Sequence, residues 1–233
     1  MSKDEDLLSE ARERFQAASD AESIYRADAL DDLRFLALDQ WPEQLRRKRE
    51  RDPNGARPCL VMDKCGQHLR QIVNDMNQNR PAIKVRAEDG RASKDCAEVF
   101  SGLMRHIEQR SGAEMAYLTA GEHAASIGRG FFRVLTEYEH ENSFSQEIAI
   151  RRIHNPFSVY FDPYSTELDG SDAEWAFVTD RLSKKAFKRQ FPDAEPVSVE
   201  HAAIGDLLEW YQEDSVRVAE YFYRATKPES LVL

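Results

Sequence analysis

The hydrophobic period of the chain changes once, at Gly128-Arg129-Gly130, and this change limits the fold more than any other feature. Before it, apolar residues recur at steps of three and four, the spacing that places them on one face of an α-helix. After it, they alternate with polar residues, as on the two faces of a β-strand. Helices followed by strands, without regular alternation of the two, predict an α+β fold and argue against a parallel nucleotide-binding sheet.

Four helices are predicted before the change of period, and proline and glycine residues mark their ends. Pro42 stops the first helix, Arg80-Pro81 stops the second, and Ser111-Gly112 separates the last two. A short half-buried strand is predicted from Ile83 to Val85, where apolar and basic residues alternate. The helices are expected at residues 3–40, 62–79, 93–109 and 113–127.

Two of these helices carry apolar stripes that need a partner. The stripe of the second helix, which is expected to face inward, consists of Leu69, Ile72, Val73 and Met76. The stripe of the first helix consists of Leu7, Ala11, Phe15, Ala18, Tyr25, Ala29, Leu33 and Leu36. The opposite face of that first helix is rich in Asp and Glu, which indicates a solvated surface.

Five strands and two short helices are predicted after the change of period. The first two strands form a long hairpin around a polar connection at residues 140–146. The strands are expected at residues 131–138, 147–153, 158–161, 175–179 and 216–223, and the helices at 183–191 and 198–211. The expected architecture is therefore a set of long N-terminal helices packed with a mainly antiparallel sheet.

We expect two parts within one continuous body. Residues 1–128 form a mainly helical part, and residues 129–233 form an antiparallel strand-rich part with two short helices. A new apolar run starts at residues 228–233, from which we expect the natural polypeptide to continue beyond Leu233.

The charge balance argues against a sequence-reading DNA-binding protein. The net charge of -10 repels polyphosphate at long range. One basic cluster stands out, Arg46, Arg47, Lys48, Arg49 and Arg51. It fits either a phosphate-facing surface or, more simply, a solvated helix end, where cations favour the helix dipole. No apolar run approaches the length of a membrane span, so we expect synthesis in the cytoplasm.

No catalytic or cofactor motif is found, so we expect no enzyme activity and no cofactor. Gly128-Arg129-Gly130 precedes a strand, which is the wrong order for a dinucleotide fingerprint. The six histidines are scattered, without a ligand pair at metal-binding spacing. The acids Asp162, Asp169 and Asp172 lack the spacing of a calcium loop and indicate a turn-rich connection between strands.

The three cysteines also give no sign of a metal site. Cys59, Cys65 and Cys96 are odd in number and lack the paired spacing of zinc ligands, so reduced thiols are expected.

Several segments resemble the portal, or head-to-tail connector, proteins of short-tailed bacteriophages. In order, they are Asp39–Pro42, Arg57–Leu60, Gln71–Asp75, Gln78–Pro81, Ile83–Val85, Gly102–Glu108, Arg151–Pro163, Gly170–Ala173 and Trp175–Val178. The whole set of segments in this order identifies the family more specifically than any one segment does. The first 25 residues match poorly, and the stem, clip and distal barrel of the family have no counterpart here, so we do not expect direct DNA contact by this chain.

The resemblance implies a structural subunit in a ring of about twelve copies. Such a ring is the conduit for DNA packaging and ejection at one capsid vertex. The implied partners are other copies of the chain, the terminase large subunit, tail adaptor proteins, and capsid and scaffolding proteins. Duplex DNA would pass through without sequence-specific binding. The implied location is the portal vertex of the virion, with assembly in the host cytoplasm, and the implied region is the outward body, or wing.

Rings need contacts in which one patch meets a different patch on the next copy. From the uneven charge we predict that a basic surface faces the acidic first helix of a neighbour. The candidate residues are Arg46, Arg47, Lys48, Arg49, Arg51, Arg151 and Arg152. Two alternatives stay open: a metal-dependent phage nuclease, motivated by the many acids, and a stand-alone interaction domain from a prophage.

Overall fold

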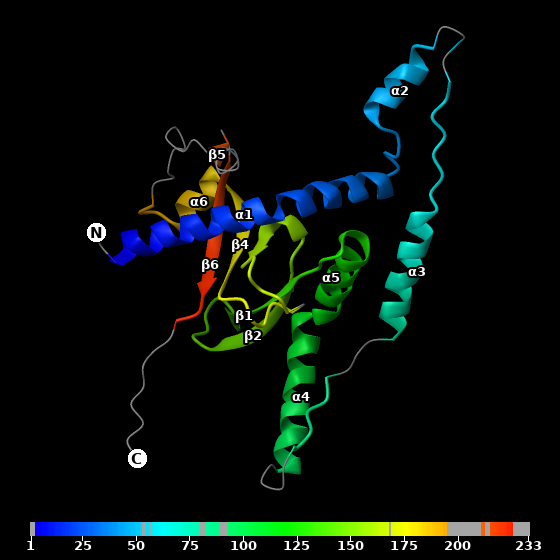
Figure 1. Ribbon diagram of the computed structural model, residues 1–233. Coiled ribbons are helices and arrows are strands. Elements are labelled where there is room, and N and C mark those ends of the chain that lie inside the picture. The colour runs from blue at the N-terminus through cyan, green and yellow to red at the C-terminus, as the bar shows by residue number, and fades with distance from the viewer. Residues whose placement is uncertain are drawn as a thin grey trace. The chain divides into compact units, whose positions relative to one another are not determined.

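The computed structural model describes most of the chain (Figure 1). Its contacts divide the chain into two units. The described residues are 3–52, 55, 57–79, 83–88, 93–167, 169–194, 211–212 and 215–225. We call Met1–Arg26 with Phe157–Leu233 the sheet unit, and Ala27–Pro156 the helical unit. Helix α1 (Lys3–Leu36) starts in the sheet unit, and its last turns belong to the helical unit.

The sheet unit contains four antiparallel strands in the order β3-β4-β6-β5. They are β3 (Val159–Phe161), β4 (Trp175–Ser183), β5 (Tyr211–Gln212) and β6 (Ser215–Tyr223). A 3-10 turn, η1 (Pro156–Ser158), precedes β3. Helix α6 (Lys184–Gln190) follows β4, and its N-terminus is capped by the Ser183 hydroxyl, which accepts a hydrogen bond from the Ala186 N–H.

The core of the sheet unit is aromatic. The period-2 pattern of β4 turns Trp175 and Phe177 to one face, where they meet Tyr160 of β3. Phe15 of α1 lies on this face, with its ring centroid 4.5 Å from that of Tyr160 and 5.4 Å from that of Phe177. Ala18 is fully buried beside it. The middle of the predicted stripe of the first helix is therefore buried where α1 covers the sheet, whereas Leu7 is exposed.

The helical unit is arranged around α5 (Ala113–Ile127), which packs mainly against three other elements. These are α3 (Cys65–Gln78), α4 (Lys94–Ser111) and the hairpin strand β2 (Gln146–Arg152), which pairs antiparallel with β1 (Phe132–Tyr138). Helix α5 also contacts β1. A separate short helix, α2 (Glu43–Glu50), precedes α3. The small core contains Ala113, Ala116 and Ile150.

Glycines set the bounds of α5, which are the predicted ones. Gly112 and Gly128 flank the helix with φ of 61° and 81°, the left-handed geometry that favours glycine. Gly130 meets a different constraint, because a Cβ there would lie 1.7 Å from the carbonyl oxygen of Ala120. The Gly128-Arg129-Gly130 segment is thus a tight turn from α5 into the hairpin.

The α+β class is confirmed, and the strand pairings are antiparallel, but several details differ from the prediction. The strands form two sheets instead of one. The first helix ends at Leu36, ahead of Leu38, whose φ is 70°. The predicted strand from Ile83 to Val85 is wrong: it is extended coil, and the Val85 N–H donates to the Ser101 hydroxyl of α4 instead of to a strand.

The predicted inward face of the second helix is only partly covered, since Ile72 and Met76 of α3 are exposed. Residues 198–210 of the helix expected at 198–211 lie outside the described residues, and Tyr211 begins a strand. Among the described residues, no helix combines the length and the apolar character that a bilayer crossing requires.

Candidate functional site: charged surfaces of the helical unit

The basic cluster at residues 46–51 lies on and just after α2, a helix that starts behind Pro42. Arg47, Lys48 and Arg49 fall in the last turn, where they interact favourably with the helix dipole. Arg46 forms an ion pair with Asp39, and Arg47 forms one with Glu43 at 2.7 Å. The Asp39 carboxylate also raises the pKa of the Arg46 guanidinium. Two of the five charges are thus already balanced within the chain.

Arg49 contributes to local structure. Its guanidinium lies 4.7 Å from the centre of the Trp41 ring and donates a hydrogen bond to the Pro58 carbonyl oxygen at 3.2 Å. Trp41 in turn donates from its indole nitrogen to the carbonyl oxygen of Leu60. These contacts fasten α2 to the extended segment that follows it.

Lys48 and Arg51 differ from their neighbours. Both are exposed, and neither side chain has a hydrogen-bond or ion-pair partner among the residues that the structure describes. They are the members of the cluster whose charge is most available to another molecule.

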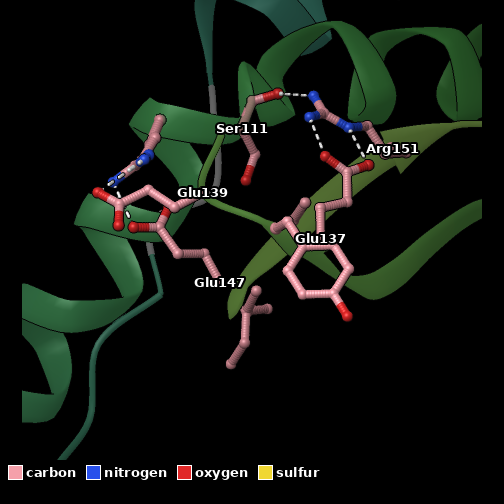
Figure 2. Close-up of a pocket in the computed structure, with 9 residues that line it drawn as sticks. Ser111, Glu137, Glu139, Glu147 and Arg151 are labelled. Atoms are coloured by element: carbon pink, nitrogen blue, oxygen red, sulfur yellow. Dashed lines mark hydrogen bonds and ion pairs between the residues drawn. The ribbon is translucent and has the colours of Figure 1, made fainter. Parts of the chain in front are cut away.

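Arg151 of β2 is held by the opposite strand of the hairpin (Figure 2). Its Nε and Nη2 donate to the two carboxylate oxygens of Glu137 at 2.9 and 2.5 Å, and its Nη1 donates to the Ser111 carbonyl oxygen at 3.3 Å. In the register of the hairpin, Arg151 lies opposite Arg133 and Glu137 lies opposite Glu147, so the long arginine side chain reaches diagonally across the two strands. The guanidinium lowers the pKa of the Glu137 carboxyl.

A second arginine–carboxylate ion pair, which the sequence did not predict, lies beside the Arg151–Glu137 pair (Figure 2). Arg110 in the last turn of α4 pairs with Glu147 at 2.5 Å and with Glu139 at 3.7 Å. With Arg151 it lines a shallow polar pocket between the end of α4 and the hairpin. Arg110 precedes the helix-ending Gly112 by two residues, but its acidic partners lie across the hairpin, so no local spacing pointed to it.

Arg152, the remaining predicted interface residue, is exposed and donates to the Nε2 of His154 at 3.3 Å. The bonding partners of Arg46, Arg47 and Arg49 lie within residues 39–60, whereas those of Arg151 are Ser111 and Glu137. No hydrogen bond or ion pair of the described residues joins the two groups. They form two separate charged surfaces.

The three acids of the loop after β3 hold turns together. Asp162 accepts hydrogen bonds from the backbone N–H groups of Tyr164 and Glu174. Asp172 accepts from Ser165 and Thr166 at 2.6 Å each. The predicted turn-rich connection is confirmed. Within the described part of the chain, no three His, Cys, Asp or Glu side chains gather as a metal site would need.

The comparison with protein families decides the identity of the chain. Residues 12–233 match the model of the phage P22-like portal protein family. The chain belongs to that family. Among its relatives is the portal protein of Acyrthosiphon pisum secondary endosymbiont phage 1, which is 28% identical over 217 residues. The alignment covers 90% of the chain and 30% of that relative, so the chain spans less than a third of the relative's length. The suspected resemblance to portal proteins is thereby confirmed, and the P22-like portal family is a structural one.

Proposed function

We propose that the chain is the wing-like body of a portal subunit, which assembles with other copies into a ring that conducts DNA at a capsid vertex. The observation that carries the proposal is the family match over residues 12–233, nearly the whole chain. The parts at residues 1–128 and 129–233 would then belong to one continuous body.

The charge of the chain suits a conduit that lets duplex DNA slide. Contacts to phosphate release counterions and hold DNA in place, so a basic wall would oppose movement. A net charge of -10 reduces such contacts. DNA would therefore pass during packaging and ejection without sequence-specific binding.

The partners follow from the same role. A packaging vertex must dock the terminase large subunit while DNA enters and tail adaptor proteins afterwards, and it must sit within capsid and scaffolding proteins. The chain would act in the virion after assembly in the host cytoplasm, in a ring of about twelve copies.

The basic surfaces are proposed contacts between neighbouring subunits, with the acidic face of α1 as the opposite patch. Reversing Arg46, Arg47 and Arg49 together would also break their bonds to Asp39, Glu43 and Pro58. The sharper test is the double variant Lys48→Glu and Arg51→Glu, because these exposed side chains hold no described partner.

That double variant should weaken ring formation measured by native mass spectrometry. The matched control is Lys185→Glu with Lys188→Glu, two exposed lysines of α6. Equal ring yields for both doubles would reject the basic residues as contacts.

The ring itself is tested by negative-stain imaging of the full-length gene product. Annular particles with a central hole are expected. Particles without a hole, or plasmid cleavage that requires Mg²⁺, would overturn the portal role and favour the nuclease alternative.

A further inference from the structure

Helix α4 carries an apolar stripe that its own unit leaves largely uncovered. At its C-terminal end, Ile107 packs against the small core of the helical unit. Toward the N-terminus the same stripe opens to solvent: Val99 is 70% exposed, Phe100 54% and Leu103 48%. The face of α4 that is covered carries Ser101, which is buried beneath the segment that contains Val85. The helix thus buries a small polar residue and exposes large apolar ones.

This exposed stripe is large enough to be a contact surface. A fully exposed side chain of this size has an accessible area of about 150–200 Å². Multiplied by their exposed fractions, the areas of Val99, Phe100, Leu103 and Met104 add up to about 300–400 Å² of exposed surface. Apolar patches of about that size on soluble proteins commonly mark interaction sites. One partner in a standard protein interface contributes roughly 800 Å², so the stripe supplies about half of one side.

Helix α3 offers a second apolar stripe, which α5 covers in part: a Cβ at Gly121 of α5 would lie 2.1 Å from the Met76 Cε. Its members follow the helical steps from Cys65 through Leu69 and Ile72 to Met76, and Ile72 is 48% exposed and Met76 40%. The rest of the helix differs from an ordinary solvated surface. Only Arg70 and Asp75 are charged among its 14 residues, although charged residues make up 32% of the chain.

Depletion of charge around exposed Ile and Met is the composition of an interface core. The two stripes therefore provide two different apolar patches on one unit, and both α3 and α4 already use α5 as their packing partner. A chain with two complementary but different patches associates head to tail, which is the arrangement that closes into rings.

We propose that the α3 stripe of one copy packs on the α4 stripe of the next copy. The inference deepens the proposed ring by naming the surfaces that join its subunits, and it rests on that proposed function. Helix-on-helix packing explains why both stripes keep the step of three and four that fits ridges into grooves. The occupant of each stripe is a second copy of this chain.

The test uses charge on both sides of the contact. Ile72→Lys and Leu103→Glu each place an unpaired charge in the apolar contact, so each should weaken self-association by about tenfold or more in sedimentation velocity. When one chain carries both substitutions, each contact pairs a lysine with a glutamate, and association should recover in part.

Two controls test whether a loss of self-association results from lost folding or from the change in net charge. Gln71→Lys and Gln109→Glu add the same charges to α3 and α4 at exposed positions on the sides opposite the stripes. They should leave association unchanged, and circular dichroism should show equal helix content for all variants.

The exposed thiols provide an independent readout. Cys65 and Cys96 lie in the α3 and α4 stripes and are both exposed. A bifunctional maleimide long enough to span a helix pair should join Cys65 of one copy to Cys96 of another in the wild type. Each of the two single charge variants should reduce this cross-link.

Three outcomes would overturn the contact. They are a wild-type chain that stays monomeric at high concentration, single variants that associate like the controls, and a double variant no better than the singles. None of these outcomes bears on whether the ring exists, because imaging of the full-length product tests ring formation separately. Rings that form normally with Ile72→Lys would keep the portal role and eliminate this interface.

Discussion

The sheet unit and the helical unit bury different kinds of side chains. In the sheet unit the buried cluster is Phe15, Ala18, Tyr160, Trp175 and Phe177, with Tyr221 stacked on Phe177 at 4.6 Å. In the helical unit the corresponding cluster is Ala113, Ala116 and Ile150. Several large apolar residues of α3 and α4 remain exposed: Ile72, Met76, Val99, Phe100, Leu103 and Met104.

This contrast separates residues that stabilise the single chain from residues that are available to partners. Aromatic side chains contribute most when buried, and edge-to-face pairs such as Phe15 with Phe177 add to the area term. An alanine core supplies little burial energy, so helices around it depend on further contacts for much of their stability. The sheet unit is therefore expected to be the more stable part of the isolated chain.

The largest expected effect is from Phe177→Ala, which removes a ring that contacts Phe15, Trp175 and Tyr221. We expect a loss of about 4 kcal/mol in the free energy of unfolding, because truncation of a buried Phe leaves a cavity. Urea unfolding followed by the fluorescence of buried Trp175 measures it.

Phe100→Ala in α4 is the matched change in the other unit. Because Phe100 is half exposed, its removal should cost no more than about 0.5–1 kcal/mol in the unassembled chain. Equal losses for the two variants would contradict the contrast between the units.

The next largest effect is expected at Arg26, the charged residue that the sheet unit holds most tightly. Its guanidinium pairs with Glu22 at 2.8 Å and donates to the carbonyl oxygens of Phe157 and Val159 at 2.7 Å each. It also lies 3.9 Å from the centre of the Tyr160 ring. Arg26→Ala leaves a largely buried Glu22 without this partner, so we expect a loss of about 3 kcal/mol.

Arg26→Lys should destabilise the chain less than Arg26→Ala does, because lysine keeps the charge. It should still cost some stability, because lysine cannot reach the carboxylate and both carbonyls at once. The control is Arg34→Ala, which removes an exposed pair with Asp31 on the same helix and should cost less than about 0.5 kcal/mol. If Arg34→Ala and Arg26→Ala shift the urea midpoint equally, the buried pair is not a stabilising contact.

The sequence predicted those elements whose ends are set by local chemistry. Gly112 and Gly128 determine α5, and alternation predicted β1, β2, β3, β4 and β6. The predicted strand at residues 83–85 failed because three alternating residues do not form a strand without a neighbour, and the Val85 N–H found a serine hydroxyl.

Burial was harder to predict than secondary structure. The period of α3 shows which residues share a face, but not whether that face is covered within the chain. The predicted inward orientation of Ile72 and Met76 was therefore only partly right. For the same reason charge alone identified Arg151, whose partner Glu137 lies on the other strand of a hairpin, without indicating that the chain itself already balances it.

A smaller effect, confined to acid, is expected at Asp172 in the sheet unit. Hydrogen bonds from Ser165 and Thr166 hold the pKa of its carboxyl far below the usual 3.8. A group whose pKa is depressed by folding stabilises above its unfolded pKa, and the contribution is lost as pH falls through and below that value. Asp172→Asn should therefore be less stable than the wild type at neutral pH, and the difference should begin to shrink below about pH 4 and continue to shrink as pH falls toward the depressed pKa of the folded carboxyl.

The measurement is the thermal midpoint as a function of pH, with Asp193→Asn, another exposed carboxylate of the sheet unit, as the control. A constant difference between Asp172→Asn and the wild type across the whole range would show that the stabilising bonds do not depend on the carboxylate charge.

The helical unit should respond to acid earlier, through His123 of α5. Partial burial lowers the pKa of this imidazole below 6.5, against the opposing effect of Glu122, and its Nδ1 is buried without a hydrogen-bond partner among the described residues. The folded chain then binds a proton at His123 less readily than the unfolded chain does. Stability contributed by the neutral imidazole is present above about pH 6.5 and declines as pH falls below it.

His123→Gln should remove that decline, so the unfolding free energies of variant and wild type should draw apart between about pH 7 and pH 5, in favour of the variant. The exposed His106 of α4 provides the control, because His106→Gln should keep the wild-type slope. The effect is the smallest of the four, since the ring is only partly buried and water screens its charge. If the unfolding free energy of His123→Gln falls with pH as steeply as that of the wild type, another group causes the earlier acid response. The distinction between an early response in the helical unit and a late one in the sheet unit would then be lost.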